Sequence, residues 1–72
     1  MIYADLLKDY LVDRSYNIKD VSIQGDKYIR HIELKFNNYD NFDKKQFQKD
    51  IDIYLRDNYK YYDISKPEIY VR

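Results

Sequence analysis

The stretch that decides the fold is residues 18–36, which reads IKDVSIQGDKYIRHIELKF. Apolar and polar residues alternate on both sides of Gly25-Asp26, as they do in strands that bury one face. Glycine in the first position of a two-residue loop favours a type II′ turn. The stretch therefore predicts a β-hairpin with strands over residues 18–24 and 27–36.

A two-residue turn would also set the register of the hairpin. In that register Ile23 lies opposite Tyr28, and Asp20 lies opposite His31. One face then packs inward and the other faces water. Arg30 is the exception on the inward face. The apolar residues expected there are Val21, Ile23, Tyr28, Ile32, Leu34 and Phe36.

Helical periodicity is found on both sides of the hairpin. Residues 2–14 carry apolar side chains at helical spacing. A second helix is expected to begin at Asp43, because Asp43 and Gln46 have the spacing of a capping box. Phe42 and Phe47 have the spacing of a hydrophobic staple around the same start. Two independent local signals therefore predict one helix start.

A short third strand is expected near the end of the sequence. Ile69 and Val71 alternate there with polar residues, and because Pro67 cannot donate to a ladder, the strand begins at Pro67 or lies at an edge of the sheet. The element order is then α-β-β-α-β, which is an α+β class. A crossover through the second helix would place both helices on one face of a three-stranded sheet. At 72 residues, we expect a single domain spanning residues 1–72.

The composition excludes several kinds of site. The chain has no cysteine and one histidine, so we expect no disulfide, no metal site and no cofactor. One glycine is too few for a glycine-rich phosphate loop. The balance of 13 acidic and 13 basic residues argues against binding nucleic acid by bulk attraction. With no membrane-spanning apolar run and no signal segment, the sequence predicts a soluble cytoplasmic protein.

One group of residues has the side-chain types of a catalytic site. Asp20, Ser22 and His31 are expected on the same sheet face. Nucleophilic catalysis also needs a pocket that excludes water and donors for an oxyanion. A flat, solvated strand face supplies neither. We therefore expect His31 to pair with Asp20 across the strands, and we expect no enzymatic activity; catalysis through His31 is the less favoured hypothesis.

Tyrosine is frequent in this sequence, with ten copies among 72 residues. Exposed aromatic patches tend to mark partner surfaces, although these rings could instead close the core with their hydroxyls in water. The leading hypothesis is a small non-catalytic protein-binding module. Size and composition favour a phage- or plasmid-encoded modulator or inhibitor of a host protein. The residues expected to bind the partner are Tyr59, Tyr61, Tyr62 and Tyr70.

Two further hypotheses remain open at this stage. Lys44, Lys45 and Lys49 form a basic patch near aromatic residues, including Tyr39, that could hold nucleic acid. Acidic residues among them, such as Asp43, would repel phosphate. The sequence also allows a homodimer, because an unpaired strand edge or an open sheet face can join two copies about a two-fold axis.

Overall fold

The computed structural model describes residues 3–37 and 42–72. These residues form two helices and one mixed three-stranded sheet, so the predicted α+β class and the order α-β-β-α-β are confirmed. The elements are α1 (Ala4–Asp13), β1 (Ile18–Gly25), β2 (Ile29–Phe36), α2 (Lys44–Asn58) and β3 (Glu68–Val71).

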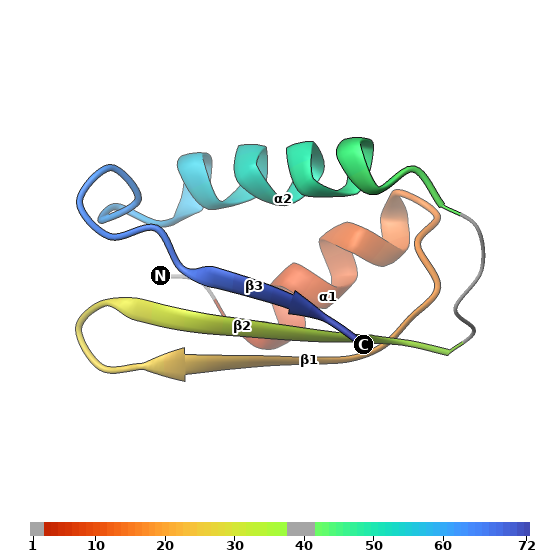
Figure 1. Cartoon of the computed structure of the whole chain (residues 1–72), viewed down its shortest axis with the longest axis horizontal. Helices are drawn as coiled ribbons and strands as arrows, with labels where there is room; N and C mark the ends of the chain where they lie inside the picture. Colours follow the sequence, from red (N-terminus) through yellow and green to blue (C-terminus); the bar gives the residue numbers. More distant parts are fainter. Residues whose placement is uncertain (1–2, 38–41) are drawn as a thin grey trace.

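The sheet has the order β1-β2-β3, with both helices on one of its faces (Figure 1). The central strand β2 is antiparallel to β1 and parallel to β3. Parallel neighbours require a crossover connection, and α2 supplies it. In residues 3–37 and 42–72, no helix is long and apolar enough to cross a bilayer.

The core lies between the two helices and the sheet, and several of its side chains are fully buried. Each helix contributes a stripe of residues three or four positions apart, which is the spacing that places side chains on one helix face. The sheet contributes alternate residues of its strands. The fully buried side chains are Leu7, Leu11, Ile32, Leu34, Ile51 and Leu55.

The register of the hairpin differs from the expected one. Ile23 lies opposite Ile32 and Val21 lies opposite Leu34, so the two-residue turn is wrong. Ile29 lies opposite Gly25, and the register shifts between Gln24 and Gly25. Between Asp20 and Gln24 the offset from the expected pairing is four residues, an even number, so Val21, Ile23, Ile32 and Leu34 keep their predicted inward face. The observed register joins apolar residues on the inward face, where the expected one placed Val21 opposite Arg30.

Gly25 makes the longer loop feasible. Its φ of 148° lies in a region that side-chain-bearing residues rarely adopt. A Cβ at this position would collide with the carbonyl oxygen of Tyr28 and come within 2.9 Å of the Ile29 Cα. The backbone of the loop therefore passes closer to Gly25 than any other residue type would allow.

The start of α2 follows the local sequence signals, with one difference. The Asp43 carboxylate accepts hydrogen bonds from the backbone N–H groups of Lys45 and Gln46, at 3.0 and 3.1 Å. The rings of Phe42 and Phe47 lie 5.4 Å apart, as the hydrophobic staple predicts. The reciprocal half of the capping box is wrong, because Gln46 Nε2 donates to Asp50 Oδ1 at 3.0 Å instead.

Candidate functional site

The four tyrosines expected to bind a partner do not share one surface. Tyr59 and Tyr62 are each only 7% exposed and belong to the core. Tyr61 is half-buried, and Tyr70 is 47% exposed on β3. The buried pair offers little area to a partner. Tyr61 and Tyr70 therefore belong to two separate surfaces, one next to the hairpin and one on β3.

Tyr59 is buried because it ends α2 against the hairpin. Its backbone N–H donates to the carbonyl of Leu55 at 2.7 Å, which closes the last turn of the helix. Its hydroxyl accepts a hydrogen bond of 2.7 Å from the N–H of Ile29, the first residue of β2. This bond fixes the end of α2 next to the tip of the hairpin, and both lie at the same end of the molecule (Figure 1).

A cleft of about 610 Å³ lies where these two segments meet. We call it the hairpin cleft. Its volume falls in the ordinary range of sites that hold a ligand or a side chain of a partner. Its walls come from β1, the hairpin loop, the start of β2 and the segment after α2. The lining residues are Ile23, Gly25, Asp26, Lys27, Ile29, Asn58, Tyr59, Lys60 and Tyr61.

Tyr61 is the centre of an aromatic cluster in this cleft. Its ring meets Tyr28 edge-to-face at 5.0 Å and Tyr59 at 6.1 Å between centroids. Lys60 Nζ lies 5.0 Å from the Tyr61 centroid, and Lys27 Nζ lies 5.9 Å from it. Both distances lie within the roughly 6 Å over which cation–π attraction between an ammonium group and a ring acts.

Among the described residues, neither lysine of the cleft has a carboxylate partner. Across residues 3–37 and 42–72, the ion pairs involve Arg14, His31 and Arg72 as the basic members, and neither Lys27 nor Lys60. Asp26 also lines the cleft without forming an ion pair to either. The cleft thus combines apolar walls with two unpaired positive charges, an arrangement that favours an anionic group beside an apolar one.

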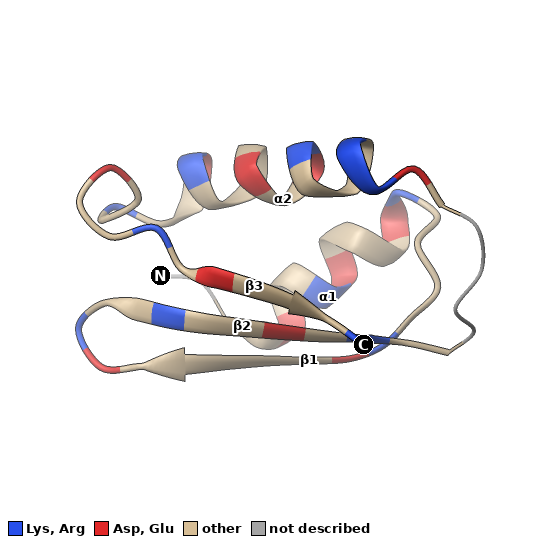
Figure 2. Ribbon diagram, viewed as in Figure 1, with Lys and Arg blue, Asp and Glu red and all other residues tan. Residues whose placement is uncertain are grey.

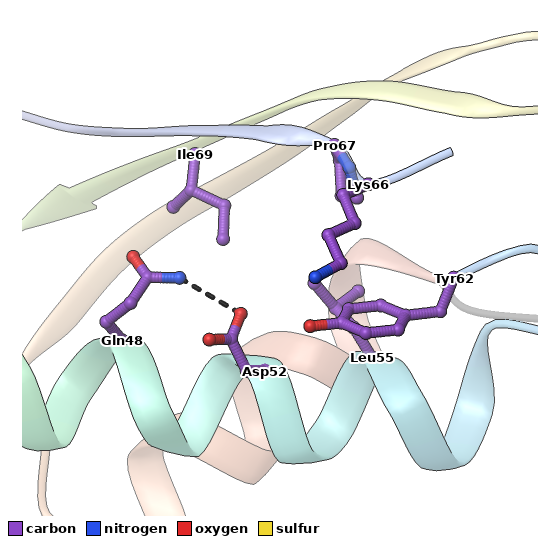
Figure 3. A pocket seen from close by; sticks show the side chains of 7 residues that line it. All are labelled: Gln48, Asp52, Leu55, Tyr62, Lys66, Pro67 and Ile69. Carbon is purple, nitrogen blue, oxygen red and sulfur yellow. Dashed lines mark hydrogen bonds between the residues drawn. The ribbon is translucent and has the colours of Figure 1, made fainter. Parts of the chain in front are cut away.

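A second groove, of about 260 Å³, lies between α2 and β3 (Figure 3). Gln48 Nε2 donates to Asp52 Oδ1 at 3.1 Å, and Lys66 Nζ lies 5.2 Å from the ring centroid of Tyr62. Figure 3 shows Ile69 pointing into this groove toward Gln48 and Asp52. The groove is smaller than the hairpin cleft, and it contains one lysine where the hairpin cleft contains two.

The expected pairing of Asp20 with His31 is wrong. Asp20 lies opposite Lys35, and His31 lies opposite Gln24, because the hairpin has the longer loop. The His31 ring stacks on Tyr70 at 4.6 Å, and its Nε2 lies 3.7 Å from the Glu33 carboxylate. The carboxylate of Asp20 accepts from the N–H of Val21 instead. Acid, imidazole and hydroxyl therefore do not converge as nucleophilic catalysis would need.

The lysines of the alternative nucleic-acid site are exposed on α2. Lys44 and Lys45 lie in its first turn and Lys49 in its second, and basic and acidic residues are interspersed along the helix (Figure 2). The carboxylate of Asp43 already occupies N–H groups at the helix start, where a phosphate would otherwise bind. Phe42 packs against Phe47, and Tyr39 lies outside the described residues. This surface is therefore poorly suited to holding phosphates and bases.

In the described part of the chain, no three His, Cys, Asp or Glu side chains are grouped so that they could hold a metal ion. No protein-family model matches the chain, and no characterised protein or solved structure resembles it at a significant level.

The sequence predicts Tyr61 as a partner-binding residue but does not predict Lys27, Ile29 or Lys60, which line the same cleft. Lys27 and Ile29 were expected in a strand on the face toward water, because a two-residue turn was assumed. The three-residue loop places Lys27 at the tip of the hairpin, where it can reach Tyr61. The position of Lys60 in the sequence could have indicated its place in the cleft, because Lys60 directly precedes Tyr61 and follows the end of α2.

Proposed function

We propose that this chain is a small non-catalytic protein-binding module and that the hairpin cleft holds a segment of its partner. The observation that carries the proposal is the cleft itself: apolar and aromatic walls lie beside two ammonium groups that have no carboxylate partner within residues 3–37 and 42–72. Tyrosine suits such a contact, because its rigid ring buries a large area against the partner with little loss of conformational entropy, while its hydroxyl remains exposed to solvent.

The chemistry of the cleft selects the kind of segment. An apolar or aromatic side chain would fill the space between Ile23, Ile29 and Tyr61. A neighbouring Asp or Glu would place its carboxylate between Lys27 and Lys60, where it gains attraction from both. We therefore infer a partner segment in which an acidic residue lies next to an apolar one.

The cellular role in this proposal is that of a modulator or inhibitor of a larger host protein. A module that binds without performing chemistry acts by covering or holding a surface of its partner. The absence of cysteine fits a reducing cytoplasm, where we place the protein. The small size and the composition favour a phage or plasmid origin.

The proposal is tested with a displayed library of random peptides and four immobilised proteins. The wild type is compared with Tyr61→Ser, with the double reversal Lys27→Glu/Lys60→Glu, and with Tyr70→Ser as a matched tyrosine control outside the cleft. We expect the wild type to enrich peptides that combine Asp or Glu with an adjacent apolar residue. Their affinity should fall about tenfold or more in both cleft variants.

The control decides whether the loss is local. Tyr70→Ser should bind the enriched peptides as well as the wild type does. Enrichment of peptides that bind Tyr61→Ser equally well would overturn the proposal, as would the absence of any enrichment. Binding of labelled DNA that falls steeply with salt and is lost on reversing Lys44, Lys45 and Lys49 would favour the nucleic-acid hypothesis instead.

A further inference from the structure

The strand β3 has an open outer edge. Among residues 3–37 and 42–72, its ladder partner is β2 alone, and it lies at the end of the sheet (Figure 1). The N–H of Arg72 donates to the carbonyl of Leu34 at 2.8 Å, and the carbonyl of Arg72 accepts from Phe36 at 3.2 Å. Backbone groups of successive strand residues point to alternate sides. Those of Tyr70 therefore also face β2, and those of Ile69 and Val71 face outward.

The side chains of β3 alternate in the same regular way. Ile69 and Val71 lie beside the inward-facing Ile32 and Leu34, so they point toward the helices. Glu68, Tyr70 and Arg72 lie on the open face, where Arg72 Nε is 2.6 Å from the Glu33 carboxylate. One face of the strand is therefore apolar, and the other carries an acid, an aromatic ring and a base in that order.

We propose that two copies of this chain pair through β3, antiparallel, about a two-fold axis that passes between their Tyr70 residues. The two sheets then form one continuous sheet with all helices on the same side. A two-fold axis makes the contact self-complementary, which is the usual geometry of a homodimer.

The backbone groups fit this register. Pairing about Tyr70 places Ile69 of one copy opposite Val71 of the other. Both residues direct their N–H and C=O groups outward, so they exchange two hydrogen bonds as a hydrogen-bonded antiparallel pair does. The two-fold axis repeats this exchange at the symmetric pair. A shift of one residue would place backbone groups that point outward opposite groups that point toward β2. The hydrogen bonds between the two β3 strands would then be lost.

The side chains select the same register. Pairing about Tyr70 places Glu68 of each copy opposite Arg72 of the other, so two pairs of opposite charge form on the open face. These positions are non-hydrogen-bonded pairs, in which side chains lie closest. A shift of two residues in either direction places Tyr70 opposite a charged residue and removes both charge pairs. β3 is therefore complementary to itself in one register.

The open edge also gives the pairing a physical reason. Edge strands with free backbone groups tend to pair with another chain unless they are blocked. A domain of this size has a small core and gains stability from association. Here the edge carries no proline within β3 and no lysine on its open face, two of the residues that commonly block such pairing.

Charge reversal tests the register directly, because Glu68 and Arg72 are exposed and their replacement leaves the core intact. Sedimentation equilibrium of the wild type should show a concentration-dependent dimer. Glu68→Arg alone and Arg72→Glu alone should each weaken it by about tenfold or more, because like charges then face each other twice. An equimolar mixture of the two variants should restore the dimer, since each reversed charge faces its opposite across the axis.

Hydrogen exchange provides a second readout that depends on the backbone. Protection of the Ile69 and Val71 amides should rise with protein concentration in the wild type and fall in the single reversals. Tyr61→Ser, which alters the hairpin cleft, should dimerise like the wild type. A wild type that stays monomeric at up to about 1 mM overturns the proposal. So does a mixture that associates no better than the single variants, or protection that rises on β1 instead.

Discussion

The hydroxyl of Tyr16 donates a hydrogen bond of 2.7 Å to Oδ2 of Asp50, a carboxylate that is only 5% exposed. The other oxygen, Oδ1, accepts from Gln46 and lies 3.8 Å from an Arg14 nitrogen. The Tyr10 hydroxyl donates to the backbone carbonyl of Asp50 at 3.1 Å. Asp50 therefore joins α1 and the segment after it to the middle of α2.

Replacing Tyr16 with Phe should destabilise the fold by about 1–2 kcal/mol, because the buried carboxylate of Asp50 loses its shortest hydrogen bond. Urea unfolding measures the change. Tyr3→Phe is the matched control, since Tyr3 is exposed and its change should stay within about 0.5 kcal/mol. Equal effects of the two substitutions would show that the bond contributes nothing to stability.

The same pair predicts how stability depends on pH. The Tyr16 hydrogen bond holds the pKa of Asp50 below its ordinary value of 3.8. The ionised Asp50 therefore adds to the free energy of unfolding above pH 3.8, and this stabilisation is lost as the pH falls further. Burial, aided by the bond to Asp50, raises the pKa of Tyr16 from 10.0 to about 12. That contribution is complete below pH 10.0 and is lost as pH rises toward about 12.

Unfolding free energies measured across both pH ranges check these signs. The free energy of unfolding of Tyr16→Phe should fall less at alkaline pH than that of the wild type. That of Asp50→Asn should fall less at acid pH. A wild type whose stability rises between pH 10.0 and about 12 would contradict the assignment for Tyr16.

Gly25→Ala should destabilise the hairpin by about 1–3 kcal/mol, because its φ of 148° and the nearby Tyr28 carbonyl leave no room for a Cβ. In a domain of this size that lowers Tm by roughly 4–24 °C. Asp26→Ala, in the same exposed loop, is the control and should change Tm far less. Thermal unfolding that gives the same Tm for both variants would refute a special role for the glycine.

Tyr59→Phe should cost about 1 kcal/mol, because the partly buried N–H of Ile29 loses its acceptor. The amide of Ile29 should then exchange with solvent faster than in the wild type. Tyr62→Phe is a fair comparison, since Tyr62 is buried to the same extent. Unchanged exchange of the Ile29 amide in Tyr59→Phe would contradict the link between α2 and the hairpin.

The order of elements could be predicted because its signals are local. The alternation on both sides of Gly25 and the signals at Phe42 and Asp43 each depend on residues close in sequence. The register of the β1–β2 hairpin could not be predicted, because Gly25-Asp26 is compatible with more than one loop length. The choice is made by contacts far apart in sequence, such as Val21 with Leu34.

The candidate site could be predicted only in part for the same reason. Tyrosine density indicated Tyr61, but which rings are buried depends on where α2 ends against the sheet. That position leaves Tyr59 and Tyr62 in the core and Tyr61 at the cleft. Lys27 joins the site only through the longer hairpin loop, which no local signal specified.

Chemical-shift mapping tests binding at the hairpin cleft most directly. Isotope-labelled protein is titrated with a library-selected peptide that pairs an acidic with an apolar residue. We expect the amide signals of Ile23, Gly25, Ile29 and Tyr61 to move together and saturate, and the shifts to vanish in Lys27→Glu/Lys60→Glu. Shifts centred on Lys44, Lys45 and Lys49, or none at saturating peptide, would contradict a partner site in this cleft.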